Sequence, residues 1–310
     1  METSIAQQNA PARQPAPIQI RPVRQADTGE CARIIFEAFF RLAERHHFPP
    51  DFPSIDVAAG LANHFIGHPS IFGVVAESGG RVVGSNFLIE HDEIRGVGPI
   101  TVDPSMQRKS IGRALMQAVL DRARAINSVG VRLVQDSFNT ASLSLYNSLG
   151  FDAREPLALI RGTPTDAGRL SGGYDARPLT EQDLPACAAL CRSVHGIERS
   201  GEIRDILGSP LRPIVLLRGG EIVGYATAPR MWVLNHGVAE TEADMQALLL
   251  AAAADGPDSA EPLSFLLPIR QADLLRWCLG QGLRVVKPMT LMSLGRYEEP
   301  RGCYYPSVLY

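Results

Sequence analysis

The sequence predicts an α/β protein built from two consecutive copies of one mixed domain. Strand-like and helix-like segments alternate along the chain, and one order of residue types recurs at a constant offset. A chain of 310 residues also exceeds the usual size of a single core. With 45% hydrophobic residues, each copy has enough apolar material to bury, so we expect a globular protein.

The charge balance argues against several classes of partner. The formal net charge is -3, from 30 basic and 33 acidic residues that are well mixed. Such mixing does not favour binding to nucleic acid or to an anionic membrane surface. No apolar run approaches the ~20 residues of a membrane-spanning helix, and the opening segment lacks the apolar core of a secretory signal. We therefore expect a cytoplasmic protein.

The cysteines and histidines do not predict a metal site or a disulfide framework. The five cysteines are odd in number and none forms a CxxC pair. Cys187 and Cys191 lie four apart on an expected helix, where a buried apolar face explains them better than a metal or redox pair. His64 and His68 share this spacing, but a glycine and a proline around the second are expected to end the helix first.

The elements of the first half follow from periodicity and turn residues. Residues 1–17 are rich in Pro and Gln and predict a disordered tail. Asp27 and Glu30 stand at capping-box spacing before the first helix, and Gly79 and Gly80 join two strands as a hairpin. The pattern predicts strand 18–23, helix 31–47, helix 54–65, strands 71–77, 81–90 and 96–102, helix 105–126, strand 131–136, helix 141–150 and strand 151–160.

Residues 161–173 are rich in turn formers and predict a linker, after which the pattern restarts over 174–310. A Gly-Gly hairpin followed by a Val-Gly pair occurs in both halves. Four residues of the first half, Arg21, Pro22, Asp27 and Cys31, reappear at one offset as Arg177, Pro178, Asp183 and Cys187. This agreement in order indicates a duplicated domain.

A phosphate-binding loop is predicted where the strand at 96–102 leads into the next helix. Backbone N–H groups and the positive end of the helix dipole converge there. Arg108, Lys109 and Arg113 add positive charge, while Ser110 and Gly112 keep side-chain bulk away from phosphate oxygens. The predicted pyrophosphate site comprises Gln107, Arg108, Lys109, Ser110, Ile111, Gly112 and Arg113.

The segment QRKSIGRAL resembles the Q/R-x-x-G-x-G/A signature of the GNAT superfamily, the Gcn5-related N-acetyltransferases. A second family landmark follows a strand later, with Asn139, then Tyr146, then Leu149-Gly150-Phe151. The resemblance covers residues 18–160, and the second half resembles a degenerate copy. Ser110 stands where the family has its first glycine, so its Cβ would crowd a loop backbone that prefers glycine, whereas its hydroxyl could donate to phosphate.

The resemblance implies tandem domains, each with a mostly antiparallel central sheet flanked by helices. It implies acetyl-CoA as co-substrate and no metal. Backbone groups near Ile100 and Val102 would bond the pantetheine arm, Asn139 would contact the cofactor, and Tyr146 would protonate the departing sulfur. Without Asn139 and the Gly-Phe pair nearby, Tyr146 would be read as a core aromatic.

The general base is not identified by any motif. Glu90 and His91 lie with Asp92 and Glu93 at a strand end where this family often keeps a carboxylate or a water relay. His91 titrates nearest neutrality, and Glu90 still belongs to the strand. A solvated charged turn explains the same residues, so both interpretations stay open.

The second half keeps a helix where the phosphate loop should lie, but Glu240, Glu242 and Asp244 would repel phosphate there. We therefore expect no CoA site in it. The second half would complete the acceptor pocket, support the first half, or mediate dimerisation. In the last case the protein would be a homodimer. The aromatic segment 296–310 would either reach over the acceptor site or, as we expect, pack on its own domain.

The sequence thus predicts an N-acetyltransferase that moves an acetyl group from acetyl-CoA to a primary amine, with a small molecule as acceptor. The alternative is a non-catalytic acyl-CoA-binding regulatory module. Retention of both Tyr146 and Asn139 favours the enzyme. A nucleotide-binding loop is disfavoured because the GxxxxGK[ST] pattern is absent.

Overall fold

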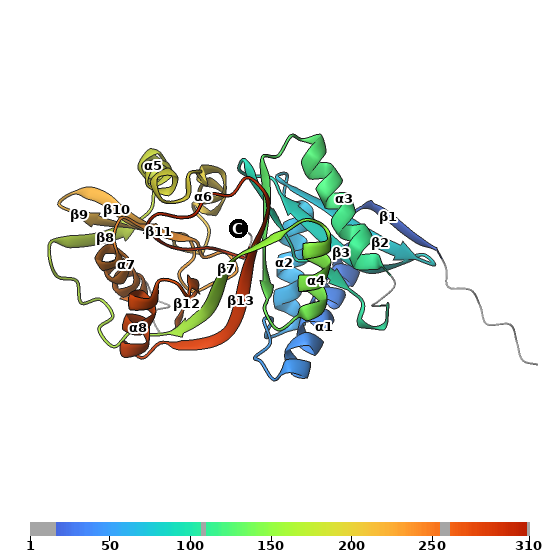
Figure 1. Ribbon diagram of the computed structural model, residues 1–310, viewed down its shortest axis with the longest axis horizontal. Helices are drawn as coiled ribbons and strands as arrows, with labels where there is room; N and C mark the ends of the chain where they lie inside the picture. Colours follow the sequence, from blue (N-terminus) through green and yellow to red (C-terminus); the bar gives the residue numbers. More distant parts are fainter. Residues whose placement is uncertain (1–16, 107–109, 255–260, 309–310) are drawn as a thin grey trace, which may run out of the picture.

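The computed structural model describes residues 17–106, 110–254 and 261–308 and contains two sheets with helices packed around them (Figure 1). In the first half the elements are β1 Ile18–Pro22, α1 Thr28–His46, α2 Ile55–Gly67, β2 Ile71–Ser78, β3 Arg81–Ile89, β4 Ile94–Val97, β5 Thr101–Val102, α3 Ile111–Ala125, β6 Gly130–Asp136, α4 Thr140–Ser148 and β7 Asp152–Gly162. In the second half they are β8 Tyr174–Pro178, α5 Leu184–His195, α6 Ser200–Ile206, β9 Ile214–Arg218, β10 Glu221–Ala226, β11 Gly237–Ala239, α7 Glu242–Ala254, β12 Leu263–Pro268, α8 Ala272–Gly280, β13 Arg284–Gly295 and β14 Cys303–Tyr305.

The first sheet has the strand order β1-β2-β3-β4-β6-β13-β7-β12, with β5 paired to β3, and the second has the order β14-β11-β10-β9-β8. All strand pairs are antiparallel except β4 with β6, which is parallel. The mixed α/β class with two sheets is therefore confirmed. None of the helices in the described part of the chain is long and apolar enough to span a bilayer.

Helices cover both faces of the first sheet. On one face, α1 and α2 bury apolar side chains against Val75 and Val82. On the other face, α3 and α4 pack against the opposite side of the same strands, including Val74 and Val83. Alternate residues of a strand point to opposite faces, which is why neighbours in sequence enter different cores. Helices on both faces thus support the end of the sheet at which α3 and α4 begin.

The first sheet takes two strands from the second half of the chain. β13 lies between β6 and β7, pairing Met289 with Asp136 on one side and with Leu157 on the other, and β12 continues the sheet beyond β7. Figure 1 shows β7 and β13 running side by side between the two bodies. The expectation that each domain holds its own sheet does not anticipate this exchange. A strand's alternating pattern predicts which face is buried but not which strand it pairs with.

Both halves repeat one ion pair near their first helix. The Nη1 atom of Arg21 lies 2.7 Å from Asp27 Oδ2, and the Nη1 atom of Arg177 lies 2.7 Å from Asp183 Oδ2. The two glycines of each hairpin turn also adopt positive φ in both halves. These recurrences agree with the duplication that the sequence indicates. The division of the chain at 161–173 stays a prediction.

Two local expectations differ from the structure. The segment 96–102 is not one strand, because Pro99 has no N–H to donate to a ladder and the chain re-pairs after it as β5. Asp27 and Glu30 do not form the expected capping box. The Asp27 carboxylate instead accepts the backbone N–H of Arg24, and Glu30 pairs with Arg33.

Candidate active site

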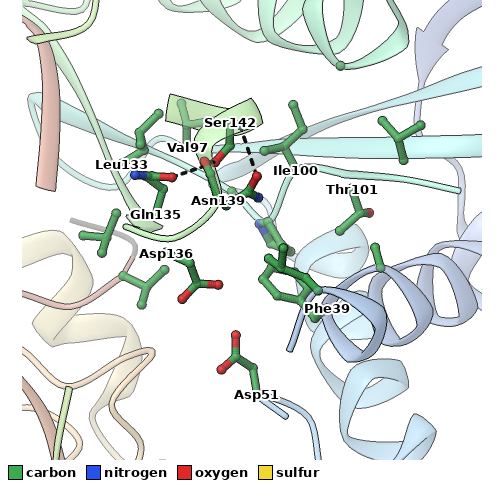
Figure 2. Close-up of a pocket in the computed structure, with 18 of the residues that line it drawn as sticks. Phe39, Asp51, Val97, Ile100, Thr101, Leu133, Gln135, Asp136, Asn139 and Ser142 are labelled. Carbon is green, nitrogen blue, oxygen red and sulfur yellow. Dashed lines mark hydrogen bonds between the residues drawn. The ribbon is translucent and has the colours of Figure 1, made fainter. Parts of the chain in front are cut away.

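A cavity of about 800 Å³ opens where two neighbouring strands of the first sheet diverge (Figure 2). β4 and β6 pair only from Ile94 with Gly130 to Gly96 with Arg132. Beyond that point the chain after β4 turns into β5 and pairs with β3, while β6 follows β13 as far as Asp136. The separation leaves room for a ligand between the two strands.

Ile100 and Val102 lie on the β5 side of this opening, and both line the cavity. Val102 pairs with Gly84 of β3, so its segment is anchored to the sheet on the side away from the cavity. A strand that is bonded on one side only keeps backbone N–H and C=O groups free on the other. These groups are available to an extended chain such as a pantetheine arm.

The start of α3 forms one end of the cavity. Ser110, Gly112 and Arg113 line it, and so does Ile111, whose side chain is buried in the core behind. The first N–H groups of a helix have no carbonyl partner within it and carry the positive end of its dipole. Gln107, Arg108 and Lys109 lie outside the described residues, so the basic part of the predicted loop has no structural account.

Ser110 adopts a left-handed backbone conformation, with φ 60° and ψ 9°. This explains why a glycine would suit the position, since a Cβ is unfavourable there. We expect Ser110→Gly to raise the free energy of unfolding by roughly 1 kcal/mol. Urea denaturation checks this, with Ser144→Gly in the body of α4 as the matched control, which should lose roughly 0.5 kcal/mol. Equal destabilisation by both variants would contradict the strain at Ser110.

Asn139, the N-cap residue of α4, and Tyr146 within α4 line the same cavity. The Asn139 side chain accepts the backbone N–H of Ser142 at 3.2 Å and so caps the helix. Two turns later the Tyr146 side chain is 5% exposed and packs beside Phe151. The cap therefore fixes the start of the helix that carries Tyr146 to the cavity.

The Tyr146 hydroxyl is held in its protonated form. Burial raises the pKa of Tyr146 well above its usual value, and the negative charge of Asp136 raises the pKa further. Within the part of the chain that the structure describes, its side chain has no protein hydrogen bond. A neutral, uncommitted hydroxyl beside a cavity suits proton donation.

Glu90 and His91 lie away from the cavity lining. Both Glu90 carboxylate oxygens accept N–H groups of Arg122, at 2.8 and 2.9 Å. The Nδ1 atom of His91 lies 2.6 Å from a carboxylate oxygen of Asp205, on α6 of the second half, and burial lowers the pKa of His91. These side chains connect structural elements, and their positions do not support a role as general base.

His64 and His68 do face each other, with ring centroids 5.2 Å apart, because α2 continues to Gly67. The Nδ1 atom of His68 accepts the backbone N–H of Ser70 at 3.2 Å, so the neutral ring carries its proton on Nε2. That nitrogen points toward Asp205, at 3.6 Å, and the proton on it opposes metal ligation.

Three charged residues that no sequence motif marks meet at the cavity. Asp51 from the α1–α2 loop and Asp136 at the end of β6 line it, and their carboxylates point toward one another in Figure 2. The Nζ atom of Lys287, on β13, lies 2.6 Å from Asp51 Oδ1 and 2.7 Å from Asp136 Oδ1. The sequence marks this cluster only through Asp136, a charged residue at the end of the buried strand 131–136. The pairing of β13 is what supplies the lysine.

The second half also reaches the cavity through Trp232, Val233, Met289 and Val308. The C-terminal segment pairs as β14 with β11, and thus packs on its own half as expected, while Val308 still contacts the cavity. At the start of α7, Asp244 accepts the backbone N–H of Thr241 and pairs with Arg218. A carboxylate therefore already occupies the helix start that would correspond to the phosphate site.

Comparisons with known proteins agree with this geometry. Residues 35–151 match the model of the acetyltransferase (GNAT) family. The chain is similar to the N-alpha-acetyltransferase RimI of Mycobacterium tuberculosis, with 31% identity over 135 residues, which cover 44% of this chain and 78% of that protein.

Two solved structures share the fold over nearly the whole chain. A Pyrococcus horikoshii protein described as an acetyltransferase superposes with a TM-score of 0.69 at 15% identity, covering 98% of each chain. A tandem GNAT protein from the clavulanic acid biosynthesis pathway superposes with a TM-score of 0.58 at 14% identity, covering 90% of this chain and 98% of that one. At these identities the likeness concerns the fold alone.

Proposed function

This chain belongs to the acetyltransferase (GNAT) family and is a GNAT N-acetyltransferase, and from that premise we propose that its acceptor is the primary amine of a small molecule. The family implies acetyl-CoA as the co-substrate. We further propose that Tyr146 is the general acid. The observation that carries the proposal is the convergence of the α3 start, the unpaired side of β5 and Tyr146 on one cavity of about 800 Å³.

The residues at this cavity suit a CoA thioester. The α3 start offers backbone N–H groups and the Arg113 side chain to a pyrophosphate. An added Cβ at Gly112 would make only an ordinary contact with Leu145, so a pyrophosphate can approach the backbone there. Backbone groups near Ile100 and Val102 would bond the pantetheine arm and polarise the thioester carbonyl. Gln107, Arg108 and Lys109, outside the described residues, would add to the phosphate site, as Asn139 would to the cofactor contacts.

The chemistry needs a neutral amine, a polarised carbonyl and a proton for the sulfur. The amine nitrogen attacks the carbonyl carbon, so that a C–N bond forms and the C–S bond breaks. Tyr146 gives its proton to the departing sulfur and regains one from the nitrogen that becomes the amide. An acid with a raised pKa is fully protonated at neutral pH, which makes Tyr146 available for this step in every turnover.

We also propose that only the first half of the chain binds CoA and carries out catalysis. Residues 18–160 would form the catalytic domain, 161–173 the linker and 174–310 a degenerate domain without a CoA site. The Asp244 carboxylate at the α7 start supports this, because it would repel phosphate. Since β12 and β13 complete the first sheet, experiments should use the whole chain.

A thiol-release assay on the whole protein tests the function. Acetyl-CoA is supplied with an arylalkylamine, a diamine, an amino acid, or a short peptide with a free α-amino group. We expect saturable, amine-dependent release of CoA thiol and a mass-spectrometric signal for the N-acetylated small amine. Preference for the peptide would instead indicate an acceptor like that named for the mycobacterial relative. Tight CoA binding without amine-dependent thiol release would favour the regulatory module.

A further inference from the structure

Three charged side chains from distant parts of the chain meet at the cavity wall. Lys287 Nζ contacts both Asp51 and Asp136, and it also lies 5.1 Å from the ring centroid of Trp232. Lys287 is 2% exposed and Asp136 7% exposed. The lysine is thus withdrawn from solvent, while both carboxylates face the cavity.

The charges of this cluster do not cancel. With both carboxylates ionised, two negative charges meet one lysine ammonium, and one negative charge remains within the cluster. A buried charge that lacks a partner in its own cluster favours binding of a ligand with the opposite charge. A ligand with one positive charge balances the cluster, and its N–H groups can donate to carboxylate oxygens that Lys287 leaves available.

Other parts of the wall restrict what that ligand is. Phe39, Phe52 and Trp232 give it an aromatic surface. Arg41 and Arg45 of α1 also line it and would oppose a second positive charge. These features favour an apolar body with a single ammonium over a polyamine.

A further polar group in the same wall is unused. Gln135 is 6% exposed, and its Oε1 accepts the Ser142 hydroxyl at 2.6 Å. Its Nε2 is buried and has no hydrogen-bond acceptor among the residues that the structure describes. A buried donor of this kind is costly unless an oxygen accepts its N–H group, and of the two proposed ligands only the CoA thioester carries such oxygens. It is an observation independent of the charged cluster that points to a ligand in this cavity.

We infer that Asp51, Asp136 and Lys287 form the subsite that binds the ammonium of a monocationic, apolar primary amine, and that Asp51 removes its proton. The inference rests on the proposed function and names its acceptor class. In the step, R–NH₃⁺ and the Asp51 carboxylate become R–NH₂ and the Asp51 carboxylic acid. The neutral amine then attacks, and Asp51 afterwards releases its proton to solvent. Lys287 and Trp232 belong to the second half of the chain, which completes the acceptor pocket through them.

The surroundings of Asp51 suit a base. Burial raises the pKa of Asp51 above its ordinary value, Lys287 lowers it, and the charge of Asp136 raises it again. The net direction is upward, toward the range in which a carboxylate exchanges protons efficiently. Among the described residues, Lys287 on β13 and Asp136 on β6 are the charged groups that act on Asp51, and Arg41 and Arg45 of α1 line the same cavity.

Binding to the CoA-loaded whole protein tests the ammonium subsite without requiring turnover. Calorimetry at pH 7 compares 2-phenylethylamine with 2-phenylethanol, which has the same body without the charge. We expect the amine to bind at least about ten-fold more tightly than the alcohol, and Asp51→Asn to remove that difference. Equal binding of the two probes, or binding of neither, overturns the subsite.

Turnover of 2-phenylethylamine then tests the proton transfer. We expect Asp51→Asn to lower kcat by at least about 100-fold and to remove the acidic limb of the pH profile, with CoA affinity unchanged. Asp51→Glu should recover part of kcat, and the exposed Asp121→Asn should match wild type in every measurement. An unchanged pH profile in a folded Asp51→Asn protein overturns the base. Selective amine binding without any turnover by wild type would sustain the subsite and count against the proposed function instead.

Discussion

We expect Tyr146→Phe to lower kcat by at least tens of fold and to leave acetyl-CoA affinity unchanged. The substitution removes one hydroxyl and keeps the ring that packs beside Phe151. The hydroxyl has no protein hydrogen bond among the described residues, so its loss leaves no buried partner unsatisfied. A positioned acid contributes ~100- to 10,000-fold, and the thiolate is a fair leaving group that water can partly assist.

The measurement needs an amine that wild type turns over, with thermal melting run beside it. Tyr174→Phe is the matched control, because it removes a tyrosine hydroxyl in the second half that bonds Asp244. We expect that variant to keep kcat within about two-fold, a change equivalent to roughly 0.4 kcal/mol. Unchanged kcat in a folded Tyr146→Phe protein would reduce Tyr146 to a core aromatic and move the acid role to water.

We expect Gly112→Glu to lower CoA affinity by at least about 100-fold, or roughly 2.7 kcal/mol. The carboxylate would stand at the α3 start, where it opposes the pyrophosphate both by charge and by size. The same charge near a helix N-terminus is favourable for the helix itself. An added Cβ would lie 3.5 Å from Leu145 Cδ2, an ordinary contact, so we expect the melting temperature to be retained.

Calorimetry on the whole protein separates the two effects. Gly112→Gln has nearly the size of the Glu variant without its charge and should lose less affinity, while Gly112→Ala should lose little. Wild type should bind one CoA per chain, since Asp244 already caps the α7 start in the second half. Normal affinity in the Glu variant would mean that the phosphate-loop assignment is incorrect.

Many local features could be predicted because their signals are short in range. Gly79 and Gly80 adopt positive φ in the turn between β2 and β3, as a Gly-Gly hairpin requires. The helical spacing after the predicted loop becomes α3, and Asn139 begins the helix that carries Tyr146. Turn residues, caps and periodicity act over a few positions, so the chain itself reveals them.

The general base could not be identified from such local sequence patterns. Glu90 and His91 lie in a charged turn beside a strand, and in the structure they pair with Arg122 and Asp205 instead of facing the cavity. Nothing in the local sequence tells a carboxylate that faces a ligand from one that joins two elements. Asp51, in a proline-rich loop, carries no motif either.

The sequence by itself determined the family, the two-copy organisation and the segments that carry the cofactor motifs. Only the tertiary structure decided that β13 lies between β6 and β7, and therefore that Lys287 meets Asp51, a residue 236 positions away. The physical reason is that strand pairing is non-local. An alternating pattern fixes which face of a strand is buried, whereas its partner depends on the backbone edge that the rest of the fold leaves open.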